Sequence, residues 1–216
     1  MTETFKMSAD TLDEFNFLEK LALNLGAIEA KVVPVGDIVV ENRVVLKCRV
    51  GCPSYDNKLN CPPYVPSVDE FRKMLKEYRY ALLVKYKSKA ETDKDVGESL
   101  LKCQHDPSVI KHLKEKASKF LDDWKEDKKQ IHQTSLELEK AAFNRGYTFA
   151  VAFSTGSCSL CEKCNIEGGK CIYPTRVRLP EHAVGVNIKK TAENAGMEIY
   201  FPFKKKPYPI ALILID

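Results

Sequence analysis

The sequence predicts an α/β protein, with α+β as the alternative, built as a single domain over residues 1–216 around a mixed sheet. Helical and strand patterns alternate along the chain, and no internal repeat divides it. With 44% hydrophobic residues, the chain can bury a substantial core. The cysteine-rich segments follow expected strands, so we expect flanking helices and cysteine-rich loops gathered at one end of the sheet.

The first half of the chain begins with an expected helix at residues 9–25, where apolar residues recur at helical spacing. The Val and Ile residues of segment 27–47 predict two or three short strands that lead to the first cysteine group. A capping-box pattern predicts a helix over residues 67–78. The nearly continuous apolar run at residues 80–86 predicts a buried strand.

The second half of the chain contains a charged segment, residues 88–133, which we interpret as a helical insertion. A helix is expected over residues 107–145, and a second capping-box pattern suggests that it breaks near Lys128. A strand over residues 147–154 then leads into the second cysteine group. The remaining elements are an expected helix at 188–195 and an expected strand at 210–215.

Charge and hydropathy exclude several classes of protein. The formal net charge of +4 comes from interspersed charges, which does not indicate a nucleic-acid partner. The N-terminal segment MTETFKMSAD lacks the pattern of a secretory signal, and the C-terminal run IALILI is too short to span a bilayer. We therefore expect a cytoplasmic protein without a membrane partner. Its eight cysteines would stay reduced there, which favours a role as metal ligands.

The second cysteine group is the segment CSLCEKCNIEGGKC. Its first three cysteines, Cys158, Cys161 and Cys164, have the C-x2-C-x2-C spacing typical of a [4Fe-4S] cluster. The fourth ligand is either Cys171, which follows a Gly-Gly pair, or Cys61, which precedes a proline. Zinc is the alternative, although four-cysteine zinc sites usually separate two C-x2-C pairs by a dozen or more residues.

The first cysteine group comprises Cys48, Cys52 and Cys61 in a proline-rich loop. Three thiolates could hold a cluster that leaves one iron open to a substrate, or the site could take a fourth ligand and become a second ordinary cluster. Cys171 and Cys103 are the candidates for that fourth ligand. On its own, Cys103 is interpreted as a surface or packing thiol.

Four segments with these motifs, in this order, give the sequence a resemblance to a known family: CRVGCPSYDNKLNCPPYVPSVDEFRKML, ELEKAAFNRGYTFAVAF, GSCSLCEKC and PTRVRLPEHAVGVNIKKTAENAG. The sequence resembles predicted metal-binding proteins of unknown function, found mostly in anaerobic archaea and bacteria. The resemblance covers most of the chain apart from about residues 88–132. It implies an anaerobic setting and metal or iron-sulfur binding through Cys48, Cys52, Cys61, Cys158, Cys161, Cys164 and Cys171.

The leading functional hypothesis is an iron-sulfur protein with one or two [4Fe-4S] clusters that exchanges electrons with a redox partner protein. The second is an enzyme that uses an open-site cluster held by Cys48, Cys52 and Cys61. The third is a zinc-stabilised binding module. Any substrate is expected between the two cysteine loops, in contact with Tyr55 or Lys58.

Overall fold

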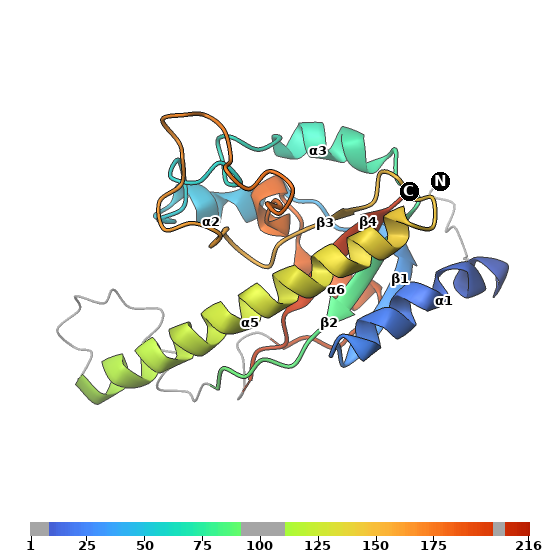
Figure 1. Cartoon of the computed structure of the whole chain (residues 1–216), viewed down its shortest axis with the longest axis horizontal. Coiled ribbons are helices and arrows are strands. Elements are labelled where there is room, and N and C mark those ends of the chain that lie inside the picture. The colour runs from blue at the N-terminus through green and yellow to red at the C-terminus, as the bar shows by residue number, and fades with distance from the viewer. Residues whose placement is uncertain (1–8, 92–110, 201–205) are drawn as a thin grey trace.

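The computed structural model describes residues 9–91, 111–200 and 206–216, apart from the side chains of residues 9–13 and 111–112 (Figure 1). Short 3-10 helices form at η1 (Val35–Asp37), η2 (Asn42–Val45) and η3 (Glu181–Val184). The α-helices and strands, in chain order, are α1 (Ala9–Asn24), β1 (Glu29–Pro34), α2 (Leu46–Arg49), α3 (Val68–Leu75), β2 (Tyr80–Lys85), α5 (Lys111–Phe143), β3 (Val151–Ala152), α6 (Ile188–Asn194) and β4 (Ile210–Ile215).

The four strands form one sheet in the order β1-β2-β4-β3, and each pair of neighbours is antiparallel. The mixed helix and strand class is confirmed in its α+β form, whereas the expected mixed sheet is instead antiparallel. Strands β2 and β4 are buried at every position, in agreement with their continuous apolar runs. A strand buried on both faces has the same pattern whether its neighbours run parallel or antiparallel, so the sequence did not distinguish the two.

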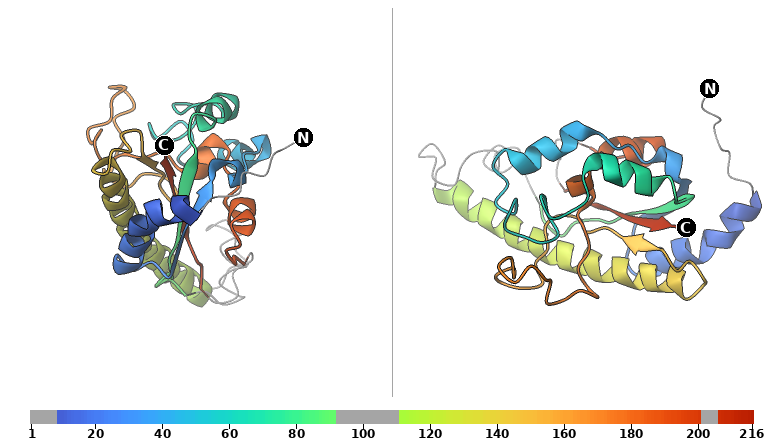
Figure 2. Two further views of the ribbon diagram at one scale, coloured as in Figure 1. Left: turned by 90° about the vertical axis from the view of Figure 1, so that its right-hand side faces the viewer. Right: turned by 90° about the horizontal axis from the view of Figure 1, so that it is seen from above.

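Helices lie on both faces of the sheet (Figure 2). Successive strand residues point to opposite faces, so Leu82 and Leu83 belong to different cores. The core under α1 and α5 includes Phe15, Leu18, Leu82, Leu138 and Ile213. The core under α3 and α6 includes Phe71, Leu83, Val184, Ala192 and Leu212. The sheet is therefore the middle layer of three.

Helix α5 is continuous over its 33 residues, so the break expected near Lys128 does not occur. Thr134, the expected N-cap, is buried, and its hydroxyl donates to the carbonyl of Ile131 at 3.0 Å. The same hydroxyl lies 2.9 Å from the phenol of Tyr86, just after β2. This tertiary contact is compatible with an uninterrupted helix. Neither α5 nor another helix in the described part of the chain is apolar enough over a sufficient length to cross a membrane.

The described part of the expected insertion, residues 88–91 and 111–133, is packed rather than detached. Asp127 of α5 is buried and accepts the backbone N–H groups of Lys89 and Ala90 at 2.9 and 3.4 Å. Ala90 in turn packs with Phe120 of α5. These contacts join the segment after β2 to the long helix. The assignment of residues 1–216 to a single domain stays a prediction.

Two segments contain less strand than expected. Residues 27–47 form one strand, β1, followed by 3-10 turns, so the first cysteine group begins on helix α2 instead of after a strand. Of the expected strand 147–154, only β3 pairs with β4. The amide of Ala152 donates to the carboxylate of Glu139 at 2.6 Å, which anchors this short edge strand to α5. The second cysteine group does follow β3, as expected.

Helix α3 begins with the capping box that its sequence predicted. The Ser67 hydroxyl accepts the N–H of Glu70 at 3.2 Å, and the Glu70 carboxylate accepts the N–H of Ser67 at 2.8 Å. Phe71 in the next turn packs edge-to-face on Phe153, with ring centroids 5.7 Å apart. Helix α3 thus supports the residues that lead from β3 to the second cysteine group.

Glu41 connects η2 to α6, and we expect this connection to fail in acid. Its carboxylate accepts hydrogen bonds from Arg43, Lys190 and Asn187 at 2.9, 2.7 and 2.7 Å. These bonds lower the pKa of Glu41 from 4.5 to about 2. A pKa that is lower in the folded state contributes stability above the unfolded-state value, and this contribution is lost as the pH falls from 4.5 towards 2.

Urea unfolding at several pH values checks this expectation. Glu41→Gln should lower the free energy of unfolding at neutral pH, and the difference from the unchanged protein should shrink as the pH falls through the range given above. Glu193→Gln on α6 is the control, since the Glu193 carboxylate makes an exposed 3.5 Å ion pair with Lys189. A pH-independent effect of Glu41→Gln would contradict the expectation.

Candidate metal centre

The first cysteine group lies on helix α2 and on the loop that follows it, and it comprises Cys48, Cys52 and Cys61. Cys48 and Cys61 are buried, whereas Cys52 is half-buried. The N–H of Asp56 donates to the carbonyl of Pro62 at 2.9 Å, and the phenol of Tyr64 donates to the Asp56 carboxylate at 2.7 Å. These bonds close the loop, so that the segment around Cys61 folds back onto its middle.

The second cysteine group lies in an irregular loop after β3, and its members are all half-buried: Cys158, Cys161, Cys164 and Cys171. Backbone N–H groups are directed at three of these sulfurs. Leu160 donates to Cys158 at 3.5 Å, Tyr173 donates to Cys171 at 3.4 Å, and Leu59 of the first loop donates to Cys164 at 3.4 Å. Hydrogen bonds of this kind stabilise negative charge on sulfur, as metal-bound thiolates require.

The two cysteine loops touch each other through three consecutive residues of the first loop. The ammonium group of Lys58 donates to the carbonyl of Cys158, although the two residues are 100 positions apart. Leu59 makes the sulfur contact with Cys164, and the side-chain amide of Asn60 donates to the carbonyl of Arg178 at 3.0 Å. The fold therefore gathers the cysteines of both groups in one region.

Burial makes the thiols of the first group difficult to ionise. It raises the pKa of Cys61 to about 12, and the neighbouring Cys52 and Cys48 add to the increase. It also raises the pKa of Cys48, again with a contribution from Cys52. Each thiolate thus opposes ionisation of the next, because like charges repel in a partly buried site. A bound cation would remove this repulsion.

Cys158 links the two groups electrostatically. Burial raises the pKa of its thiol, the Leu160 N–H and the Lys58 ammonium oppose this increase, and Cys161 and Cys171 reinforce it. Cys158 also contributes to the raised pKa of Cys61 in the first group. Sulfurs from both loops are therefore near enough to influence each other's charge.

Within residues 9–91, 111–200 and 206–216, no group of three or more His, Cys, Asp or Glu side chains is arranged to hold a metal ion. The ligand sets expected for the two cysteine groups therefore stay predictions, and Cys103 lies outside the described residues. The donor chemistry nevertheless fits a thiolate-bound metal. Seven cysteines without disulfides lie on α2 and in two touching loops, and backbone N–H groups already point at three of them.

The two residues expected to contact a substrate occupy different places in the first loop. Lys58 lies between the cysteine loops, where it donates to the Cys158 carbonyl. Tyr55 is half-buried, and its backbone N–H donates to the carbonyl of Cys52 at 3.1 Å. The interpretation of both as substrate contacts stays a prediction.

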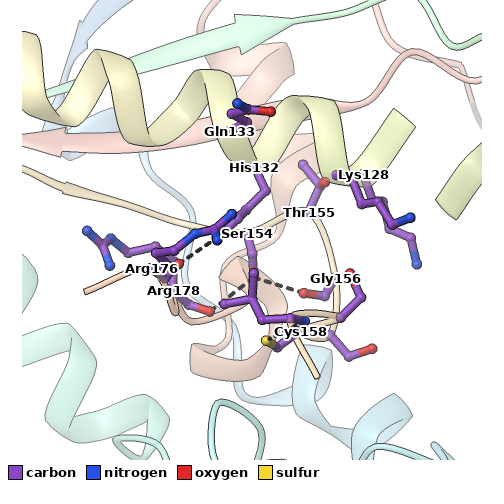
Figure 3. Close-up of a pocket in the computed structure, with 13 residues that line it drawn as sticks. Lys128, His132, Gln133, Ser154, Thr155, Gly156, Cys158, Arg176 and Arg178 are labelled. Carbon is purple, nitrogen blue, oxygen red and sulfur yellow. Dashed lines mark hydrogen bonds between the residues drawn. The ribbon is translucent and has the colours of Figure 1, made fainter. Parts of the chain in front are cut away.

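A basic pocket of about 300 Å³ adjoins Cys158, between helix α5 and the second cysteine loop (Figure 3). Its lining includes two lysines, two arginines, a histidine and several hydroxyl groups. The basic residues are Lys128, Lys129, His132, Arg176 and Arg178. The Nε2–H of His132 donates to the carbonyl of Arg176 at 2.7 Å, which connects the helix to the loop. Burial lowers the pKa of His132, so its ring is favoured in the neutral form.

A second pocket, about 400 Å³ in volume and mainly apolar, lies between α3, the edge strand β3 and the two cysteine loops. Its lining includes Leu59 of the first loop and Cys171 of the second. Arg178 lies between the two pockets, lines both, and forms a two-bond ion pair with Glu139 of α5. Both side chains are only 17% exposed.

Sequence patterns alone did not identify the residues of the basic pocket. Lys128 and His132 lie in the segment expected to form a charged helix, and Thr155 directly follows the expected strand 147–154. The one available signal was the pair Arg176 and Arg178 in the segment TRVR, which follows the last cysteine and lies in a motif of the family resemblance. Pocket formation depends on α5 packing beside that segment, which no local pattern encodes.

An α+β fold with seven cysteines in two touching loops defines a cysteine-rich protein equipped for metal binding. The chain belongs to the family described as predicted metal-binding protein, DUF2284, whose model matches residues 31–215. The matched range includes both cysteine groups and confirms the resemblance seen in the sequence. No curated protein and no solved structure matches the chain.

Proposed function

We propose that this protein is an iron-sulfur protein in which Cys158, Cys161, Cys164 and Cys171 hold a [4Fe-4S] cluster. The observation that carries the proposal is the C-x2-C-x2-C spacing in a loop whose sulfurs accept backbone N–H bonds. Membership in a predicted metal-binding family supports metal binding in general, without indicating which metal is bound.

Such a cluster supplies one-electron transfer when it is bound. The N–H groups of Leu160, Leu59 and Tyr173 disperse negative charge on the sulfurs, which makes reduction easier. Lys58 and Leu59 of the first loop contact Cys158 and Cys164, so the first loop packs against the proposed cluster site. We propose Cys48, Cys52 and Cys61, which lie in the neighbouring segment, as ligands of a second centre.

We propose electron exchange with a partner protein in the cytoplasm, where thiols stay reduced. Exposed apolar side chains on α2 and the cysteine loops support this role, because such side chains are available for contact with a partner protein. Val50, next to the first group, is 81% exposed. The other large exposed apolar residues of these segments are Leu46, Tyr64, Ile172 and Tyr173.

A second candidate is an enzyme with an open-site cluster on Cys48, Cys52 and Cys61. The observation that favours it is the pair of pockets beside the cysteine loops, one basic and one apolar. A plain electron carrier needs neither pocket. A zinc-stabilised binding module is the third candidate, and its support is limited to the donor chemistry of the thiols.

Anaerobic purification followed by iron, acid-labile sulfide and zinc counting tests the proposal. We expect about four irons and four sulfides for each occupied [4Fe-4S] site, with an absorbance that bleaches on reduction. Cys52→Ser should lower the iron content if the first group holds a second centre, while the cluster of the second group remains. A colourless protein that contains zinc and no sulfide would contradict the proposal.

A further inference from the structure

The basic pocket beside Cys158 carries positive charge that its lining does not neutralise. Among the 13 described residues that line it, none is Asp or Glu. Arg178 is paired with Glu139, and Lys129 with Glu126 at 2.6 Å. For Lys128 and Arg176, no ion pair is formed within the described part of the chain. Two positive charges of the pocket therefore remain available to a ligand.

Further cations near Lys128 add to the positive charge of the pocket. Burial lowers the pKa of its ammonium group, and the positive charges of Lys58 and Lys125 lower it further. A cation that is half-buried among other cations is stabilised by an anion placed next to it. Lys58 itself extends from the first cysteine loop to the carbonyl of Cys158, a lining residue, so both loops contribute to the potential here.

Thr155 supplies an independent indication of a ligand. Its hydroxyl oxygen is buried and has no hydrogen-bond partner among the described residues. The side chain lines the same pocket as Lys128 (Figure 3). A buried hydroxyl without a partner destabilises the fold, because it has lost its hydrogen bonds to water. The neighbouring Ser154 hydroxyl, in contrast, donates to the carbonyl of Gly156 at 2.8 Å. The Thr155 hydroxyl is thus a hydrogen-bond donor available to a ligand in the pocket that also contains the unpaired charges of Lys128 and Arg176.

We propose that the pocket formed by Lys128, Thr155 and Arg176 binds a small oxyanion, either free phosphate or sulfate or the phosphate group of a small metabolite. Two cations and a hydroxyl donor match an anion with several acceptor oxygens. A cavity of about 300 Å³ admits a small molecule and excludes a folded partner. The pocket abuts Cys158, so the bound anion would lie next to the candidate metal centre. The inference does not depend on which metal the cysteines hold.

Isothermal titration of the metal-loaded protein with inorganic phosphate, sulfate and glycerol phosphate tests the proposal, with sodium chloride at matched ionic strength as the reference. We expect saturable binding that Lys128→Gln and Arg176→Gln each weaken at least about tenfold, since each removes a charge-assisted hydrogen bond. Lys119→Gln is the matched control, because Lys119 lies on the same helix and pairs with Asp123 at 2.6 Å.

Thr155→Val separates ligand binding from folding. The valine has nearly the same shape and lacks the unpaired hydroxyl, so the anion-free variant should melt at the same temperature or higher. The increase in melting temperature on adding phosphate should be smaller than in the unchanged protein. Tighter binding of glycerol phosphate than of phosphate would identify the ligand as part of a larger molecule, and the reverse order would identify a free anion.

Absence of saturable binding, or equal weakening by Lys119→Gln and Lys128→Gln, would overturn the proposal. Iron and sulfide counts on the same samples keep this outcome separate from the proposed function. A zinc protein that still binds phosphate through Lys128 would refute only the iron-sulfur assignment. An iron-sulfur protein without saturable anion binding would refute only the oxyanion site.

Discussion

Cys164→Ser is expected to remove the metal bound by the second cysteine group. The sulfur of Cys164 belongs to the C-x2-C-x2-C run and accepts the N–H of Leu59, so it joins the second cysteine loop to the first. Residues that only support metal ligands already cost about 10- to 100-fold in affinity when they are changed. Loss of a ligand should therefore weaken binding by more than about 100-fold. Metal analysis of the anaerobically purified variant measures this loss.

Cys103→Ser is the matched control for this prediction, because it makes the same chemical change at the one cysteine outside the two groups. We expect it to retain the full metal content. Circular dichroism of both variants checks that the helices have formed. Full metal content in Cys164→Ser, or an equal loss in both variants, would refute the assignment of Cys164 as a ligand.

Glu139→Ala is expected to destabilise the fold by about 3 kcal/mol. The carboxylate of Glu139 accepts three hydrogen bonds: Arg178 donates to it through two nitrogens, and the N–H of Ala152 in β3 donates at 2.6 Å. Its removal leaves a largely buried guanidinium group and an edge-strand amide without their acceptor. For a chain of this length, the melting temperature should fall by roughly 6–12 °C.

Thermal unfolding of two further variants tests the cause of this loss. Glu126→Ala on the same helix removes an ion pair with Lys129 in which Glu126 is 63% exposed, so its effect on stability should be much smaller than that of Glu139→Ala. The double variant Glu139→Leu with Arg178→Met should recover part of the stability, because it leaves no unpaired buried charge. Equal effects of Glu126→Ala and Glu139→Ala would contradict the prediction.

Several elements were predictable because their signals are local. The apolar runs at residues 80–86 and 210–215 predicted buried strands, and β2 and β4 are buried throughout. Ser67 and Glu70 predicted the start of α3, because a capping box involves only one turn of helix. The spacing of the second cysteine group similarly made it a candidate metal site before any fold was known.

Other predictions were wrong where distant parts of the chain decided the outcome. The pattern at Thr134 suggested a helix start, yet this buried residue contacts Tyr86, 48 positions away, inside a continuous helix. Strand 147–154 was overpredicted, because an edge strand is limited by the neighbour with which it can pair. In this sheet β3 pairs over Val151 and Ala152 only.

The sequence by itself determined the class of fold, the two central strands and the two cysteine groups, since each depends on residue types at short spacing. Only the tertiary structure decided the antiparallel strand order, the contact of Lys58 and Leu59 with the second cysteine loop, and the basic pocket. Lys128, Thr155 and Arg176 come together because α5 packs beside the loop after β3. Such packing is set by the burial of whole helix and sheet faces, which no short motif records.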